Sequence, residues 1–126
     1  MIISGTVIQG SGIGKKLGLP PTMNLSPRRL PKSFAFGIYA VRVKTPVGEF
    51  FGALHYGPRP AVHAPLSFEV HAIGLKKKLY GERISVEIVE RIREVKKFAS
   101  VPELKKAILE DIARAKDLLT NHYLEV

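Results

Sequence analysis

The amino-acid sequence predicts a mainly β fold, a small barrel or sandwich with the barrel favoured, followed by one C-terminal helix. From residue 1 to residue 92, short apolar runs alternate with Gly and Pro, which is typical of short strands joined by turns. From Ser100 onwards, a capping motif is followed by apolar residues at the spacing of a helix. A closed barrel is favoured because closure removes exposed strand edges that invite aggregation.

The length and composition predict one domain. With 126 residues and 45% hydrophobic content, residues 1–126 can bury a single core. The absence of cysteine excludes disulfides, a thiolate nucleophile and a thiolate metal site, and it fits a cytoplasmic location. No apolar run approaches the roughly 18 to 20 residues that span a bilayer, and no basic region precedes an apolar stretch at the N-terminus. We therefore expect neither secretion nor membrane insertion.

The chain is strongly basic. Lys and Arg number 20 against 11 Asp and Glu, which gives a net charge of +9. Anionic partners are therefore expected, and nucleic acid, anionic lipid and phosphorylated small molecules all qualify. A basic surface can also serve solubility alone, so the net charge does not identify which class of anionic partner the chain binds.

Residues 1–32 predict one strand and then a long irregular stretch. The apolar residues from Ile2 to Ile8 predict a strand interrupted at Gly5. The stretch from Gln9 to Gly18 has glycine at positions 10, 12, 14 and 18, which predicts neither strand nor helix. Prolines at positions 20, 21, 27 and 31 predict irregular chain through Lys32, because proline fixes φ and lacks an N–H.

A hairpin, two more strands and the helix follow. The alternating run from Gly37 to Lys44 faces Phe50 to Tyr56 across a turn at residues 45–48, and residues 66–73 and 83–92 predict further strands. Ser100 and Glu103 form a capping box, in which Ser100 accepts from the amide of Glu103 and Glu103 reaches back to the N–H of Ser100. The apolar stripe that we expect to pack on the barrel is Leu104, Ile108, Ile112, Ala115 and Leu119.

Two neighbouring segments carry candidate ligands for a phosphate and a metal ion. Gly10 to Lys16 combines glycine amides with two lysines, which suits a polyphosphate, although a lone glycine-rich loop is more often a flexible turn. It is not a Walker loop, because no Gly-Lys-Ser/Thr ends it. Thr22 and Asn24 offer oxygen ligands of the kind that complete the shell of a nucleotide-bound Mg²⁺. The alternative is that they make only turn hydrogen bonds.

Glu69 is the candidate general base. Strand alternation puts Glu69 on one face with Ser67 and His71, opposite Phe68 and Val70. On that face it either meets solvent, which is the commoner case, or lines the interior or mouth of the barrel, where its pKa could be tuned for proton transfer. His55 and His71 could join it as metal ligands, but their spacing matches no familiar site, and we give a catalytic metal cluster little weight.

Several short motifs follow one another in a fixed order along nearly the whole chain. They are Gly10-Ser11-Gly12-Ile13-Gly14, Pro21-Thr22-Met23-Asn24, Gly37-Ile38-Tyr39-Ala40-Val41, Gly57-Pro58-Arg59-Pro60, Phe68-Glu69-Val70-His71, Leu79-Tyr80-Gly81, Ile92-Arg93-Glu94 and Lys97-Phe98-Ala99-Ser100. Each motif is weak by itself, but together and in this order they resemble the riboflavin kinase family. That resemblance implies a six-stranded antiparallel Greek-key barrel with a C-terminal helix, and transfer of the ATP γ-phosphate to the 5′-hydroxyl of riboflavin to give FMN.

The resemblance also implies a role for each matching residue. The glycine loop would hold the nucleotide phosphates, a Mg²⁺ ion would be bound just after it, a carboxylate would take the hydroxyl proton, and the segment before the helix would cover the isoalloxazine ring. The implied residues are Gly10, Gly12, Gly14, Lys15, Thr22 and Asn24 for the nucleotide, Thr22 and Asn24 for Mg²⁺, Glu69 for catalysis, and Arg93 and Phe98 for the flavin.

The chain departs from the family pattern at a few positions. One extra residue at Pro20-Pro21 precedes Thr22, Met23 replaces a usual alanine, and His55 replaces a usual asparagine. A catalytically degenerate flavin- or nucleotide-binding barrel is therefore an alternative. Most bacterial relatives also carry an adenylyltransferase domain, for which 126 residues leave no room, so the chain is expected to stop at FMN.

A nucleic-acid-binding barrel is a third alternative, motivated by the charge of +9. It is ranked last because only 8% of the residues are aromatic and none is Trp, whereas such barrels usually present stacking aromatics. We expect a monomer whose partners are riboflavin or FMN and ATP or ADP, with no specific nucleic acid and no membrane.

Overall fold

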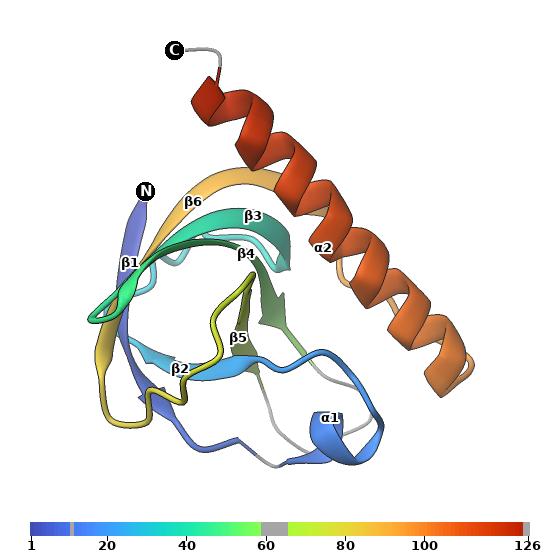
Figure 1. Cartoon of the computed structure of the whole chain (residues 1–126). Helices are drawn as coiled ribbons and strands as arrows, with labels where there is room; N and C mark the ends of the chain where they lie inside the picture. Colours follow the sequence, from blue (N-terminus) through green and yellow to red (C-terminus); the bar gives the residue numbers. More distant parts are fainter. Residues whose placement is uncertain (11, 59–65, 125–126) are drawn as a thin grey trace.

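The computed structural model describes residues 1–10, 12–58 and 66–124, and within these ranges six antiparallel strands close into a barrel (Figure 1). A long helix lies across the outside of the barrel, and a helical turn lies in the loop after the first strand. The elements are β1 (Ile2–Ile8), α1 (Ile13–Lys16), β2 (Met23–Pro27), β3 (Gly37–Thr45), β4 (Gly48–Gly57), β5 (Ser67–Ala72), β6 (Arg83–Arg93) and α2 (Val101–Leu124).

The strands run in the order β1-β2-β5-β4-β3-β6, and pairing of β1 with β6 closes the barrel. β3, β4 and β5 are consecutive neighbours, and β2 lies beside β5 rather than beside β3. A strand that lies beside the far member of three consecutive strands makes a Greek key. The predicted six-stranded antiparallel Greek-key barrel with a C-terminal helix is therefore confirmed.

The predicted hairpin is also confirmed. β3 and β4 pair from Gly37↔Tyr56 to Thr45↔Gly48, so that Pro46 and Val47 form the turn. The Oγ1 of Thr45 donates to the carbonyl of Gly48 at 2.9 Å and accepts from the N–H of Val47 at 3.1 Å. The threonine hydroxyl thus supplies the turn with hydrogen bonds of the kind that Ser and Thr commonly make there.

The prediction that Gly5 interrupts the first strand was wrong. β1 is continuous through Gly5, which pairs with Pro27 on one side and with Ile84 on the other. A β-carbon at Gly5 would lie 2.9 Å from the carbonyl oxygen of Ser26. The glycine is therefore in the strand because β2 approaches closely there, and not because the strand breaks.

The region from Gln9 to Lys32 contains more regular structure than predicted. α1 is a helical turn inside the glycine-rich stretch, where no helix was expected, and β2 lies between the prolines. β2 was not predicted, because tertiary contacts stabilise it. These are pairing with β1 and β5 and burial of Leu25, which is 5% exposed. Neither pairing is visible in a local pattern.

The interior of the barrel is filled by the apolar side chains that each strand directs inward. Because successive side chains in a strand alternate between faces, the residues between them lie on the outside. The most completely buried members of this interior cluster are Val7, Val41, Val43, Leu54, Val70, Ile84 and Val86.

The helix α2 packs on the outer surface of the barrel through small residues. Ala115 and Leu119 are fully buried against Ala40 and Ala53, as the predicted stripe requires, and Leu104, Ile108 and Ile112 are half-buried. Alanines on both surfaces allow the helix to approach the strands closely. Within the described residues, no helix has both the length and the apolar surface needed to cross a membrane.

The capping box is confirmed in one of its two hydrogen bonds. The N–H of Glu103 donates to the Oγ of Ser100 at 3.3 Å, as predicted. The carboxylate of Glu103 accepts from the N–H of Ala99 at 3.2 Å, and not from the N–H of Ser100 as expected. The glutamate therefore also orders the residue that precedes the cap.

Candidate functional site

A row of polar side chains crosses the outer face of three neighbouring strands. Asn24 on β2 is the register partner of Glu69 on β5, and Glu69 is also the register partner of His55 on β4. Register partners carry their side chains on the same face of the sheet, about 4.5–5.5 Å apart at Cβ. Phe68 and Val70, which flank Glu69, belong to the interior core. Of the alternatives for Glu69, the outer face is the one observed, and there Glu69 is half-buried.

Hydrogen bonds hold the two histidines beside this row. The Nδ1 of His55 and the Oγ of Ser67 share a hydrogen bond of 2.7 Å, and Ser67 is only 8% exposed. The Nδ1–H of His71 donates to the carbonyl of Pro21 at 2.6 Å. No group of three potential metal ligands of the His, Cys, Asp and Glu types occurs in the described parts of the chain.

The glycine loop meets the row at Asn24. Ile8, the last residue of β1, pairs with Asn24, and the side chain of Asn24 then lies over the Cα of Gly10. A β-carbon at position 10 would lie 2.8 Å from the Cγ of Asn24 and closer still to its Nδ2. Any side chain at position 10 would therefore require the amide of Asn24 to move.

The rest of the glycine loop folds into a compact turn. Gly12 and Gly18 have φ angles of 78° and 70°, a region that favours glycine. Between them, the N–H of Lys16 donates to Gly12 O at 3.2 Å and the N–H of Leu19 donates to Gly14 O at 2.9 Å. Residues 12–19 are therefore held by backbone hydrogen bonds, and the side chain of Lys15 is exposed on α1.

Thr22 is exposed and lies two residues before Asn24, at the entry to β2. The residue before it, Pro21, is anchored to β5 through its carbonyl by His71. This anchor links the entry of β2 to the strand that carries Glu69. The sequence suggests His71 only as a possible metal ligand, and its hydrogen bond to Pro21 depends on the packing of β5 beside β2.

Arg93 and Phe98 lie together at the other end of the site. Arg93 ends β6, and the carbon of its guanidinium lies 5.7 Å from the centre of the Phe98 ring. The guanidinium also makes a two-point ion pair with Asp111 on α2. Sequence reasoning missed Asp111, although an acidic residue inside the apolar stripe of a helix was a signal for it.

The segment between β6 and α2 packs on the end of β4. A β-carbon at Gly57 would lie 3.0 Å from the Cγ2 of Val95 and 3.3 Å from the Cβ of Phe36. Gly57 has a φ of 147° and is the register partner of Ser67, whose hydroxyl is hydrogen-bonded to His55. The segment that follows Arg93 therefore reaches the end of β4, two residues beyond His55. Arg59 and Pro60, from the same motif as Gly57, lie outside the described residues.

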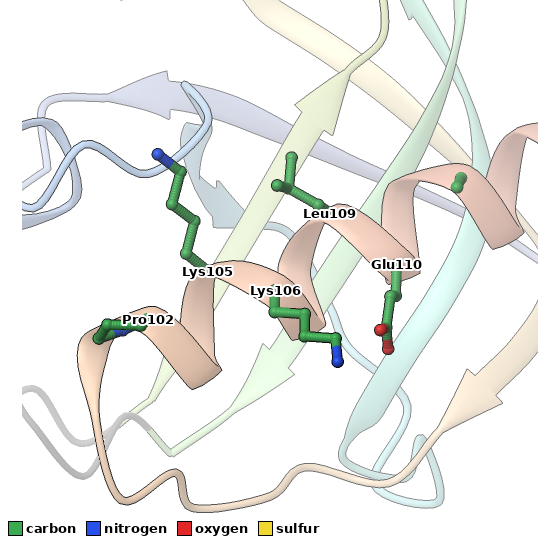
Figure 2. Close-up of a pocket in the computed structure, with 6 residues that line it drawn as sticks. Pro102, Lys105, Lys106, Leu109 and Glu110 are labelled. Atoms are coloured by element: carbon green, nitrogen blue, oxygen red, sulfur yellow. The ribbon is translucent and has the colours of Figure 1, made fainter.

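A shallow hollow of about 480 Å³ lies elsewhere, on the outer surface of α2 (Figure 2). All of its lining residues belong to that helix, and none belongs to the row on β2, β4 and β5. It is therefore separate from the residues that the sheet brings together. The lining residues are Pro102, Lys105, Lys106, Leu109, Glu110 and Ala113.

The family model of flavokinase, described as riboflavin kinase, matches residues 1–119. The chain is 35% identical over 116 residues to a bifunctional riboflavin kinase/FMN adenylyltransferase of Haemophilus influenzae, covering 90% of this chain and 37% of that protein. It is 32% identical over 114 residues to the RNA-binding riboflavin kinase RibR of Bacillus subtilis, covering 89% of this chain and 48% of that protein. The chain thus spans between a third and a half of these relatives.

Two solved structures share the fold. The crystal structure of a macrolide-efflux protein from Streptococcus pneumoniae matches with a TM-score of 0.75 and 28% identity, covering 87% of this chain and 36% of that one. The crystal structure of riboflavin kinase from Trypanosoma brucei matches with a TM-score of 0.63 and 20% identity, covering 98% of this chain and 82% of that one.

Proposed function

The chain belongs to the riboflavin kinase family, and we propose that it transfers the γ-phosphate of ATP to the 5′-hydroxyl of riboflavin, giving FMN and ADP. The observation that supports this most is the cross-strand pair of Asn24 and Glu69. It brings a candidate metal ligand and a candidate proton acceptor together on one outer face. A phosphoryl transfer needs both functions at one place.

In this proposal Glu69 orients the 5′-hydroxyl and accepts its proton. Glu69 is half-buried between Asn24 and His55, so its carboxylate is held by the sheet and still reachable from outside the barrel. Phosphoryl transfer asks the protein mainly for positioning and for neutralisation of charge, because the transition state has little covalent chemistry to assist. One well-placed carboxylate is therefore sufficient as the base.

Thr22 and Asn24 are the residues that would hold Mg²⁺. Their oxygens are the hard, neutral ligands that this ion takes when phosphate and water supply the rest of its shell. Asn24 is the cross-strand partner of Glu69, and Thr22 lies two residues earlier, directly before β2 begins. The donor set therefore fits the ion. When bound, Mg²⁺ neutralises charge on the phosphate oxygens.

The glycine loop is assigned to the phosphates. Gly10 gives the backbone close approach beside Asn24, and the loop continues through Gly12 and Gly14 to the exposed ammonium of Lys15. Backbone without side chains, together with a cation at its end, provides the contacts that a polyphosphate needs. The flavin ring is assigned to the opposite side, beside Arg93 and Phe98, where the segment before α2 reaches the end of β4.

The test is formation of FMN from riboflavin, ATP and Mg²⁺ by the purified chain, followed by separation of FMN from riboflavin. The proposal expects one FMN for each ADP formed. The alternative, a catalytically degenerate barrel, expects binding of riboflavin or nucleotide with no FMN. Omitting Mg²⁺ is the internal control, since phosphorylation should stop while riboflavin still binds.

We further propose that the chain acts as a monomer in the cytoplasm and binds no nucleic acid with sequence selectivity. The family uses ATP as co-substrate, so the charge of +9 is assigned mainly to phosphate groups and to a generally basic surface. The similarity to an RNA-binding riboflavin kinase covers 48% of that protein and supplies a specific reason to measure RNA binding.

A further inference from the structure

Asp111 is a buried carboxylate on the apolar face of a helix. It is 7% exposed and lies one turn from Ile108 and from Ala115, both of which face the barrel. Among the described residues, only Asp111 and Ser67 are polar and buried. Burial of a charge costs free energy unless a partner compensates for it. The partner therefore indicates what Asp111 does.

Arg93 is that partner, and the contact is made at two points. The Nε of Arg93 donates to Oδ1 of Asp111 at 2.8 Å, and its Nη2 donates to Oδ2 at 2.7 Å. The two side chains are 20% and 10% exposed. A two-point contact fixes the plane of a guanidinium as well as its position. Because apolar replacement of such a pair is often neutral for stability, stability alone is a weak reason for its presence.

The fixed guanidinium contacts both ends of residues 94–98, the segment that follows β6. Its remaining terminal nitrogen, Nη1, donates to the carbonyl of Glu94 at 2.9 Å, at the start of the segment. Its carbon lies 5.7 Å from the centre of the Phe98 ring, near the end of the segment. Val95, between these two points, packs against Gly57 at the end of β4. A rotation of the guanidinium would therefore disturb the whole segment.

We propose that Asp111 is a positioning residue for flavin binding. It holds the Arg93 guanidinium in one plane, and this guanidinium holds residues 94–98 in the shape that receives the flavin ring. The proposal rests on the proposed function, in which Arg93 and Phe98 are assigned to the flavin. Asp111 touches neither substrate, so its effect should appear in riboflavin affinity and not in the phosphate-transfer step.

The first variant is Asp111→Asn, which keeps the shape of the side chain and removes its charge and one acceptor. Loss of a charge-assisted hydrogen bond corresponds to about tenfold or more in an equilibrium constant. We expect the dissociation constant for riboflavin, measured by quenching of flavin fluorescence, to rise by about tenfold. The KM for ATP and the kcat at saturating riboflavin should stay within about twofold of the parent, since transition-state contacts are unchanged.

The matched control is Tyr123→Phe, at the far end of the same helix. Tyr123 donates to Oε1 of Glu87 at 2.9 Å and so anchors α2 without contacting the segment. If Asp111 merely anchors the helix, both variants should weaken riboflavin binding in proportion to their loss of melting temperature. The proposal expects a change in riboflavin affinity for Asp111→Asn only.

A second variant guards against misfolding of the first. Arg93→Met with Asp111→Leu replaces the whole pair by apolar side chains, which leaves no unpaired charge and should preserve folding. Its riboflavin affinity should still fall by about tenfold or more, because the guanidinium is gone. Parent-like riboflavin binding by this folded double variant, or by Asp111→Asn, overturns the proposal while FMN formation by the parent stands. A parent that binds no riboflavin overturns both this proposal and the proposed function.

Discussion

The side chain of Asn24 lies directly over the Cα of Gly10, so the asparagine occupies the space that any larger residue at position 10 would need. Gly10 follows the end of β1 and Asn24 belongs to β2, and the two strands pair through Ile8 and Asn24. Gly10, at the start of the glycine loop, and the candidate metal ligand Asn24 are therefore packed against each other. Disturbing one of them should displace the other.

Gly10→Ala tests this contact. The new methyl would overlap the amide of Asn24, and such overpacking costs about 1–3 kcal/mol. We expect a lower melting temperature and weaker binding of Mg²⁺-ATP, with riboflavin binding little changed. Adding Asn24→Ala removes the overlap, so the double variant should regain the melting temperature without regaining Mg²⁺-ATP affinity. If the double variant is as unstable as Gly10→Ala, the clash is not the cause.

Thr22→Ala and Asn24→Ala test the metal assignment. Each removes one oxygen ligand, so each should weaken binding of Mg²⁺-ATP more than binding of riboflavin, as calorimetry with each ligand would measure. Ser26→Ala is the matched control, because Ser26 is exposed on the same face of β2, two residues beyond Asn24. An unchanged Mg²⁺ dependence in both site variants would mean that the extra residue at Pro20-Pro21 has moved the pair out of the site.

The prediction of β3 and β4 succeeded because the information is local. Alternating apolar residues and the turn at residues 45–48 specify a hairpin without help from the rest of the chain. β2 was missed for the opposite reason. Its proline-rich neighbourhood argues against a strand, and it is stabilised by pairing with β1 and with the distant β5 and by burial of Leu25.

In the candidate site, too, some features follow from the local sequence and others depend on tertiary contacts. Glu69 could be proposed from its motif and from strand alternation, but its place between Asn24 and His55 depends on the register of three strands. Asp111 receives no role from the sequence, because the helical period identifies only the apolar residues of the buried face. Its role requires knowing that the end of β6 lies under that turn of α2, which is a tertiary contact.

The pH dependence of stability tests whether Tyr123 anchors α2 to the barrel. Its ring stacks on Phe51 and lies against the guanidinium of Arg42, which also pairs with Glu49. Burial, followed by the hydrogen bond to Glu87, raises the pKa of Tyr123 above its usual value of about 10. The folded state therefore retains the phenol proton more tightly than the unfolded state does. This contribution to stability is complete below about pH 10 and is lost as the pH rises through the folded-state pKa.

Tyr123→Phe removes both the hydrogen bond and the ionisation. We expect the variant to be about 1 kcal/mol less stable below pH 10, and the difference from the parent to shrink at higher pH. Urea unfolding at a series of pH values measures it, and Tyr80→Phe is the control because Tyr80 is 56% exposed. A difference that is constant, or that grows above pH 10, would contradict the assignment.

Salt dependence tests the assignment of the basic surface. If several Lys and Arg side chains tracked a nucleic-acid strand, log affinity would fall with log salt at a slope of about −0.7 per phosphate contact. We expect only weak, unselective binding to RNA or single-stranded DNA at physiological salt, with competition by ATP where that binding overlaps the loop from Gly10 to Lys15. Tight and selective binding to one oligonucleotide, without FMN formation, would favour the nucleic-acid-binding barrel.

In the proposed reaction, Glu69 accepts the proton of the riboflavin 5′-hydroxyl during phosphoryl transfer. The most direct measurement is the single-turnover rate of FMN formation by the parent and by Glu69→Gln, at saturating riboflavin and Mg²⁺-ATP. The amide keeps the shape of the side chain and cannot take the proton, so the rate should fall by about 10²–10⁴, while the melting temperature and both ligand affinities stay near those of the parent. If the chemical step limits the rate and the Gln variant reacts as fast as the parent, Glu69 is not the proton acceptor.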